Sequence, residues 1–428
     1  MKKFSLEEFT IDLPNKVEKY LSKFSVLPSG IYLKEKRKFE MVVVVPAIKE
    51  YENIKTLISS FNSTDGKYHD KFLILFVINN SASASEEVKS ENRKSFEFLK
   101  NMKNQTSLSY GIIDAFSHGN ELNEKHAGVG LARKTGLDTA LCLLDYSEEN
   151  FPTLISLDAD CTVSKNYFTD LYETIVKKKL NAGYVNFLHP IDNQPFAEAI
   201  IKYEISLRYY VLGLKFAQSP FAYFSIGSTM FSSWVAYVKI GGMNKRKAGE
   251  DFYFMEKLAK NYTINKIANV YVYPSPRTSW RVPFGTGKSV SEIQKGSNRY
   301  DFLYNPQIFE ILKKWNSLFF SSKVLTSEKY LGEAKKINIG LYEFLVEKKF
   351  QQKWDKILFD NKNQLSLQKQ KLFLFDSFAT LKLIHYLQNN YFSNVKNIDA
   401  INFLFRKIKI NQNCRNEIEC LKLLRKQT

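Results

Sequence analysis

Two nearly continuous apolar runs with a helical stretch between them constrain the fold of this chain more than any other feature. The runs are Met41-Val42-Val43-Val44-Val45-Pro46 and residues 71–78, and the intervening residues 50–61 carry apolar side chains at helical spacing. A strand, a helix and a second strand in this order predict a right-handed crossover between parallel strands. Because continuous apolar runs are typical of strands covered on both faces, the sequence predicts an α/β fold with a mostly parallel sheet flanked by helices.

The same alternation continues along the chain and then changes character near residue 300. Further strands are predicted at 110–115, 152–157 and 182–188, with a strand or turn at 227–231. Helices are predicted at 86–102, 128–144, 165–179, 196–216 and 252–260. Amphipathic lysine-rich stretches then predict helices at 307–315, 342–350, 372–387 and 401–410. The length of 428 residues exceeds one typical domain. We therefore expect an N-terminal extension (1–40), an α/β domain (41–300) and a basic, mainly helical C-terminal region (301–428).

The net charge of +18 predicts an anionic partner. Residues 301–428 hold 22 basic and 12 acidic side chains, so +10 of that charge lies there. Composition alone does not choose among nucleic acid, an anionic membrane face and phosphorylated substrates. The sequence shows no helix-turn-helix, zinc-finger or RNA-binding signature, so we expect no nucleic-acid partner. For the C-terminal region, peripheral contact with an anionic membrane and formation of a homodimer both stay open.

The cysteines and the N-terminus suggest an intracellular protein. Cys142, Cys161, Cys414 and Cys420 form no Cys-x-x-Cys pair, and we expect buried thiols in a reducing compartment. The first ten residues contain acids and no apolar core, which argues against a signal peptide. The apolar region 200–240 is interrupted by charged residues, so no transmembrane helix is expected. These features predict a cytoplasmic location, peripheral on the inner membrane face if the basic region binds lipid.

The Asp158-Ala159-Asp160 sequence directly follows the predicted strand 152–157. Open α/β sheets bind ligands at the carboxyl ends of their strands. Mg²⁺ and Mn²⁺ prefer carboxylate oxygens and usually bind through one or two of them, with phosphate oxygens and water completing the shell. The motif therefore suggests a metal-bound diphosphate. The alternative is a solvated turn whose acids cap the next helix.

A second acidic pair, Glu250-Asp251, begins a predicted helix shortly after Gly241-Gly242-Met243-Asn244. Alone, two acids there can simply complement the helix dipole. Together with Asp-Ala-Asp, however, the set resembles the family 2 glycosyltransferases of GT-A fold. In that family a Val-Val-Val-Pro strand, an Asp-x-Asp strand end, a Gly-Gly-hydrophobic-Asn turn and a Glu-Asp helix start recur in this order. The resemblance covers about residues 41–290.

The resemblance implies an inverting, divalent-metal-dependent glycosyltransferase. Such an enzyme moves a sugar from a nucleotide-diphosphate sugar to a hydroxyl of a saccharide or lipid-linked acceptor, as in cell-surface polysaccharide or glycolipid synthesis. It also implies a set of nucleotide-sugar-binding residues: Pro46, Ala47, Glu50, Asn79, Asn80, Arg133, Asp158, Arg277 and Arg281. Ile48 and Lys49 replace the family's usual aromatic residue and Asn, and the two asparagines replace its common Asp-Asp. The identity of the base is therefore open.

Individual roles also follow from the resemblance. Asp160 is implied to bind Mn²⁺ or Mg²⁺, with Asp158 contacting the ribose or sugar and the ion. Asp251 is implied to be the base that deprotonates the acceptor, with Glu250 as a second candidate or orienting partner. A surface location on a helix is the alternative for Arg133.

Two further segments match parts of the family's site. Residues 275–287, with Arg277 and Arg281, are similar in placement to a loop that closes over the diphosphate, although an ordinary connecting loop is the alternative. Gly227 and Ser228 are implied to line the acceptor side, and core packing is equally compatible with them.

Two other functions compete with glycosyl transfer. A nucleotidyltransferase on a related sheet would need a glycine-rich, basic phosphate cradle near the first strand, which residues 46–50 lack. A non-catalytic protein that binds a membrane surface or nucleic acid through its basic charge is the second alternative.

Overall fold

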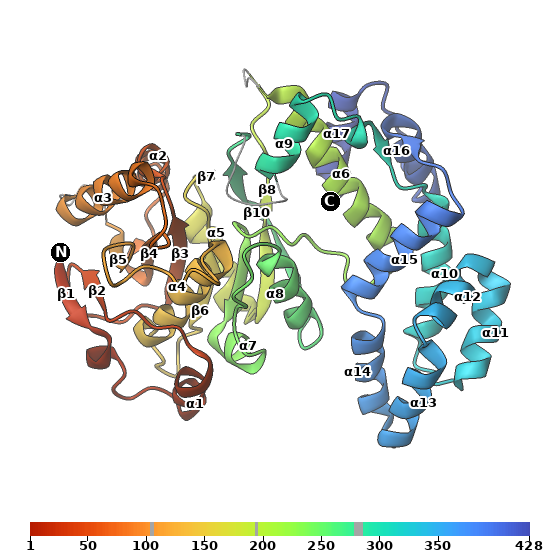
Figure 1. Ribbon diagram of the computed structural model, residues 1–428, viewed down its shortest axis with the longest axis horizontal. Coiled ribbons are helices and arrows are strands. Elements are labelled where there is room, and N and C mark those ends of the chain that lie inside the picture. The colour runs from red at the N-terminus through yellow and green to blue at the C-terminus, as the bar shows by residue number, and fades with distance from the viewer. Residues whose placement is uncertain (103–106, 193–195, 278–285) are drawn as a thin grey trace. The chain divides into compact units, whose positions relative to one another are not determined.

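The structure is a computed structural model that describes residues 1–102, 107–192, 196–277 and 286–428. The chain packs into two compact units, and each is built from two separate stretches of sequence (Figure 1). The α/β unit comprises 1–190 and 225–285, and the helical unit comprises 191–224 and 286–428. The predicted domain boundaries near residues 40 and 300 stay predictions.

A ten-stranded sheet forms the centre of the α/β unit, in the order β1-β2-β5-β4-β3-β6-β9-β8-β10-β7. Its strands are β1 (Lys2–Ser5), β2 (Gly30–Leu33), β3 (Met41–Ala47), β4 (Phe72–Asn79), β5 (Ser109–Ala115), β6 (Thr153–Ser156), β7 (Cys161–Val163), β8 (Ala182–Phe187), β9 (Met230–Ser233) and β10 (Asn265–Pro274). Seven of the ten run in one direction, because only β2, β9 and β7 are antiparallel to the rest. The predicted α/β class with a large, mostly parallel sheet is confirmed.

Helices cover both faces of this sheet. They are α1 (Asn15–Phe24), α2 (Tyr51–Asn62), α3 (Glu86–Asn101), α4 (Val129–Leu143), α5 (Tyr167–Lys178), α7 (Trp234–Lys239) and α8 (Glu250–Ala259), with short 3-10 turns at Leu6–Phe9 and His69–Lys71. Alternate side chains of β3 point to opposite faces. Val43 and Val45 pack in a core that includes Ile54 and Leu57 of α2. On the other face a β-carbon at Gly136 of α4 would overlap Val44, so α4 lies directly against the strands.

The helical unit is built around α6 and a run of helices after residue 286. Its helices are α6 (Ala197–Phe216), α9 (Thr286–Gln294), α10 (Gln307–Phe319), α11 (Ser327–Ile337), α12 (Ile339–Glu347), α13 (Phe350–Asp360), α14 (Gln364–Leu374), α15 (Ser377–Asn390), α16 (Asn397–Lys407) and α17 (Glu417–Gln427), with a 3-10 turn at Arg299–Asp301 and a small sheet of β11 (Phe302–Leu303) and β12 (Val395–Lys396). Trp315, Phe319, Tyr330 and Trp354 are fully buried together in its core. Aromatic packing of this kind buries a large apolar area per residue, and it confirms the predicted helical C-terminal part.

Two of the predicted C-terminal helices have other bounds in the structure. The predicted helix 372–387 is divided because α14 ends at Leu374 and the Asp376 side chain caps α15, accepting a hydrogen bond from the Ala379 N–H at 2.9 Å. The predicted helix 342–350 corresponds to α12, which ends at Glu347, and Lys349 adopts a left-handed conformation with φ of +55° before α13 begins at Phe350. In both places a local backbone feature overrides an amphipathic pattern that continues through it.

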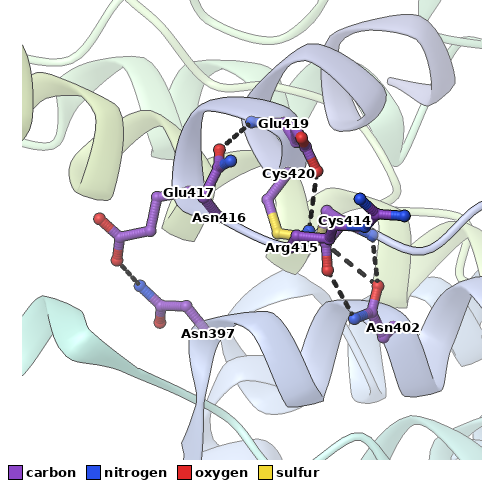
Figure 2. Close-up of a disulfide and its surroundings, with 8 residues drawn as sticks. All are labelled: Asn397, Asn402, Cys414, Arg415, Asn416, Glu417, Glu419 and Cys420. Atoms are coloured by element: carbon purple, nitrogen blue, oxygen red, sulfur yellow. Dashed lines mark hydrogen bonds between the residues drawn. A yellow bond between two sulfur atoms is a disulfide. The ribbon is translucent and has the colours of Figure 1, made fainter.

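The expectation of four free thiols is wrong for two of the cysteines. Cys414, in the segment between α16 and α17, forms a disulfide with Cys420 in the first turn of α17, and both are buried (Figure 2). The side-chain amide of Asn402 hydrogen-bonds the backbone of Cys414 on both sides. Its Nδ2 donates to the Cys414 carbonyl oxygen at 3.0 Å, and its Oδ1 accepts from the Cys414 N–H at 2.9 Å. Cys142 and Cys161 are free and buried.

Within the described ranges, none of the helices has both the length and the apolar character needed to cross a bilayer.

Candidate functional site

The two acids of the Asp-Ala-Asp sequence lie between β6 and β7, at the carboxyl end of a central strand. The side chain of Asp158 is 34% exposed and that of Asp160 is 23% exposed. Neither caps the following helix, because α5 begins at Tyr167 and its N-cap residue is Asn166. The alternative of a solvated capping turn is therefore excluded, and both carboxylates are held by arginines.

Arg133 joins two of the predicted site acids. It lies on α4, and its guanidinium donates through Nη2 to Asp158 Oδ1 and through Nη1 to Glu250 Oε1. Only 4% of its side chain is exposed, so the alternative of a solvated surface arginine is wrong. Burial opposes its charge, but Asp158, Glu250 and Asp251 outweigh burial, and the pKa of Arg133 is raised.

Gly227 lies directly against this arginine. A β-carbon at position 227 would overlap the guanidinium of Arg133, so only glycine fits there without displacing it. The neighbouring Ser228 is 2% exposed and hydrogen-bonds the thiol of Cys161, which follows Asp160 in the sequence. The two residues predicted on the acceptor side therefore pack against neighbours of the acids, Gly227 against Arg133 and Ser228 against Cys161.

The Glu250-Asp251 pair occupies the first turn of α8. Gly249 precedes it with a positive φ of 70°, and Asn244 donates from Nδ2 to the carbonyl oxygen of Glu250 at 3.0 Å. The Gly-Gly-Met-Asn turn thus fixes where this helix begins. In the described part of the chain no cation forms an ion pair with Asp251, whose Oδ1 accepts from the Phe252 N–H at 2.7 Å.

Burial changes the proton affinity of both acids. It raises the pKa of Glu250 to about 7, against the opposing effect of Arg133. Burial also raises the pKa of Asp251, and Arg133 again opposes it. A base that acts near neutral pH needs a pKa raised in this direction. Because Arg133 forms an ion pair with Glu250, and no cation in the described ranges forms one with Asp251, the two acids differ chemically.

Arg277 connects the second acid of the strand-end motif to Glu50. Its Nη2 donates to Asp160 Oδ2 at 2.8 Å and also to Glu50 Oε1, and its Nε donates to Asp160 Oδ2 at 3.0 Å. Glu50 precedes α2 and is 3% exposed, and its other oxygen accepts from Asn53 Nδ2. Burial opposes the charge of Arg277, but Asp160 and Glu50 outweigh it and raise its pKa.

The remaining predicted residues lie at the ends of neighbouring strands. Pro46 and Ala47 end β3, and Asn79 ends β4. The Asn79 amide donates to the carbonyls of Ala47 and Val77 at 3.0 Å each, and the Asn80 amide donates to Phe116 at 3.2 Å. Both asparagines thus brace the strand ends through backbone contacts. Arg281 lies outside the described residues.

The acids near Arg277 suit a divalent ion of the predicted kind. Nη2 of Arg277 contacts one oxygen of Asp160 and one oxygen of Glu50, so the two carboxylates already share one cationic group. Carboxylate oxygens are the donors that Mg²⁺ and Mn²⁺ prefer. Within the described ranges no three or more His, Cys, Asp and Glu side chains form a metal-binding group. Two carboxylates with phosphate oxygens and water would still match the way Mg²⁺ usually binds.

The sequence interpretation missed a buried polar cluster on the helix that carries Arg133. Asp138 of α4 accepts hydrogen bonds from Tyr20 at 2.7 Å, from Tyr237 at 2.8 Å and from the Val26 N–H at 2.8 Å. Lys134 lies 3.0 Å from the same carboxylate. A lysine and an aspartate four residues apart on a helix rich in small and apolar residues were the available signal, since such charges are buried only when paired.

No protein-family model and no curated protein matches this sequence. Among solved structures, the chain is similar to S. aureus TarS 1-349 in complex with UDP-GlcNAc, with 13% identity, a TM-score of 0.39, and coverage of 73% of this chain and 87% of that chain. It is also similar to the mannosyltransferase PcManGT from Pyrobaculum calidifontis in complex with GDP-Man and Mn²⁺, with 13% identity, a TM-score of 0.38, and coverage of 87% and 90%. A longer S. aureus TarS structure matches with 14% identity and a TM-score of 0.35, over 55% of this chain and only 37% of that chain.

Proposed function

We propose that this chain is an inverting glycosyltransferase that uses a nucleotide-diphosphate sugar and a divalent ion. The observation that carries the proposal is the placement of Asp251 beside the Arg133–Glu250 pair. Asp251 is a partly buried acid with a raised pKa, and none of the described cations forms an ion pair with it. Arg133 also binds Asp158, at the carboxyl end of a central strand where open α/β sheets bind ligands. A base, a cation and two strand-end acids are thereby gathered in one place.

Each side chain takes a role that its contacts favour. Asp251 accepts the proton of the acceptor hydroxyl as that oxygen attacks the anomeric carbon of the donor. Glu250 fixes Arg133, and Arg133 in turn orients Asp158 toward the ribose or sugar. Asp160, with Glu50, would hold Mn²⁺ or Mg²⁺, and a bound ion would offset the charge that grows on the leaving diphosphate. One base acting in a direct displacement gives inversion of the anomeric carbon.

The proposal is tested by measuring nucleoside diphosphate release from a panel of nucleotide sugars, with and without Mn²⁺. We expect release from at least one donor, and loss of turnover in Asp251→Asn with donor binding retained. Asp160→Ala should remove the metal dependence of donor binding. Asp355→Asn serves as the control, because Asp355 is exposed on α13 of the helical unit. No release from any donor, or unchanged turnover in Asp251→Asn, would contradict the proposal.

The identity of the products separates the competing functions. Given a nucleoside triphosphate and a sugar phosphate, a nucleotidyltransferase would join the nucleotide to the sugar phosphate and release pyrophosphate, whereas a glycosyltransferase releases a nucleoside diphosphate from a nucleotide sugar. A protein that only binds an anionic surface would give neither product. The anomeric configuration of the transferred sugar, read by NMR, tests inversion separately from activity.

We also propose that the helical unit contacts an anionic membrane and so brings the enzyme to a lipid-linked acceptor. Phe359 of α13 and Leu365 of α14 are 79% and 81% exposed, and the two helices pack side by side (Figure 1). Lys356 and Lys362 flank Phe359, with Lys362 Nζ 5.7 Å from the centre of its ring. Exposed apolar side chains among lysines combine burial in the interface with attraction to anionic lipid.

Sedimentation with liposomes tests this contact. Wild-type protein should bind vesicles that contain phosphatidylserine and release them as salt is added, because charge attraction is screened. Phe359→Ser with Leu365→Ser should lose most of the binding, and Phe24→Ser, an exposed aromatic in the α/β unit, should not. Equal binding by both variants would contradict the proposal, and a loss of self-association instead would indicate a dimer contact.

A further inference from the structure

We propose that Arg277 is a built-in cation that competes with the divalent ion for Asp160 and is displaced when that ion and the donor bind. The inference rests on the proposed donor site, but it concerns a binding competition that can be measured without transfer. It gives Arg277 two successive partners, the acids Glu50 and Asp160 first and the donor diphosphate afterwards.

The contacts of Arg277 show why the two cations compete. Its Nη2 contacts Asp160 Oδ2 at 2.8 Å and Glu50 Oε1, and Nε reaches the same Asp160 oxygen at 3.0 Å. A divalent ion bound directly to a carboxylate lies about 2.0–2.1 Å from its oxygen for Mg²⁺. An ion that bound both carboxylates would lie between Asp160 Oδ2 and Glu50 Oε1, which is the position that Nη2 of Arg277 occupies, so the guanidinium and the ion compete for it.

Burial explains why a cation is needed before any ligand arrives. Glu50 is 3% exposed, and a buried carboxylate without a compensating partner is strongly unfavourable. Arg277 supplies that partner, while its own side chain stays 31% exposed and so has solvent on one side. The exposed side gives it room to leave Asp160. Arginine is suited to the second partner because its planar donors match phosphate oxygens in pairs.

The competition predicts opposite changes in two affinities when Arg277 is replaced. In Arg277→Ala, Mn²⁺ binding in the absence of donor should tighten about tenfold or more, because the ion no longer has to displace a guanidinium from the acids. Donor binding at saturating Mn²⁺ should weaken, because a phosphate contact is lost. Misfolding would weaken both, so the opposite signs identify competition.

Free Mn²⁺ measured by electron paramagnetic resonance gives the metal affinity. Calorimetry gives the donor affinity, with a donor found in the release assay or with UDP if none is found. Arg277→Lys keeps a positive charge and should stay close to wild type in metal affinity. Arg37→Ala is the matched control, because Arg37 contacts Asp70 and Ser109 before β4 and at the start of β5, away from the acids. Asp160→Asn added to Arg277→Ala should remove the gained metal affinity.

Several results would overturn the inference. Unchanged or weaker Mn²⁺ binding by Arg277→Ala would show that Arg277 does not compete with the ion. A gain that survives Asp160→Asn would place the ion elsewhere. Absence of transfer activity together with the predicted gain in metal affinity would reject the proposed function and keep the competition.

Discussion

Arg133 and Glu250 form an ion pair in which each side chain is only 4% exposed. Asp251, the next residue of α8, forms no ion pair with any cation among residues 1–102, 107–192, 196–277 and 286–428. Adjacent acids in the first turn of one helix therefore have different surroundings. Glu250 is engaged in holding the arginine that also binds Asp158, and this difference is the basis for proposing Asp251 as the proton acceptor.

This difference predicts that replacing Glu250 lowers the stability of the protein much more than replacing Asp251 does. Glu250→Ala leaves the buried charge of Arg133 with one partner fewer, and removal of one member of a buried pair typically costs about 3–5 kcal/mol. Asp251→Asn removes no ion pair, so its free energy of unfolding should stay within about 1 kcal/mol of wild type. Denaturant unfolding of the purified variants measures both values. Equal losses of stability in the two variants would contradict the assignment.

Gly227 should be indispensable for the position of Arg133. In Gly227→Ala the new β-carbon overlaps the guanidinium, so the arginine must leave Asp158, Glu250 or both. We expect donor affinity to fall by about tenfold or more, the effect of losing one charge-assisted contact. Calorimetric titration with the donor found in the release assay measures this change.

Gly332→Ala is the matched control for that experiment. Gly332 lies within α11, and beyond its own helix backbone and chain neighbours a β-carbon there would meet none of the described heavy atoms within 4 Å. Alanine in a helix interior is more stable than glycine by roughly 0.5–1 kcal/mol, so this variant should bind donor normally and melt slightly higher. A Gly227→Ala variant with unchanged donor affinity would show that Arg133 can move without consequence.

The central strands were predictable because a continuous apolar run within each strand's own sequence marks it. Every residue of β4 is buried, and the same continuous apolar run is visible in the sequence. The antiparallel strand β9, the edge strand β7 and its neighbour β10 have no such run. They are short or partly exposed, and their pairing depends on residues far away in the chain.

The candidate site was predictable as a set of residue types and only partly as a set of contacts. Asp158, Asp160 and Glu250 follow strands or begin helices, so their placement at one end of the sheet follows from topology. That Arg277 bridges Asp160 to Glu50 does not follow, because residues 50 and 277 are 227 positions apart and meet only through tertiary packing. The cluster around Asp138 was not predicted for the same reason, because Tyr20 and Tyr237 are far from Asp138 in the chain and reach it only through tertiary packing.

The Asp138 cluster should stabilise the α/β unit strongly. Asp138→Ala removes the partner of the buried Lys134 and the acceptor of Tyr20 and Tyr237, so we expect a loss of about 3–5 kcal/mol. Tyr20→Phe removes one hydrogen bond to the carboxylate and should cost about 1.5–3 kcal/mol. Both values come from denaturant unfolding. A larger loss for Tyr20→Phe than for Asp138→Ala would contradict this order.

Lys371 of α14 should make the stability of the helical unit depend on pH. Its side chain is buried, donates to the carbonyls of Ser321 and Lys323 at 2.8 and 2.7 Å, and lies 5.8 Å from the ring centre of Phe319. Burial lowers the pKa of Lys371 from 10.5 to about 8. Between these two values the unfolded chain binds more protons than the folded chain, so the free energy of unfolding rises with pH in this window and is independent of this group below it.

The comparison with Lys371→Met isolates that contribution, because methionine fills a similar volume and does not titrate. The difference in unfolding free energy, wild type minus variant, should rise by about 1–3 kcal/mol as the pH increases from about 7.5 to 9.5. Other groups that titrate in this range are common to both proteins and cancel in the difference. A difference that stays flat or falls with pH would show that the buried ammonium keeps its proton, held by the carbonyls of Ser321 and Lys323.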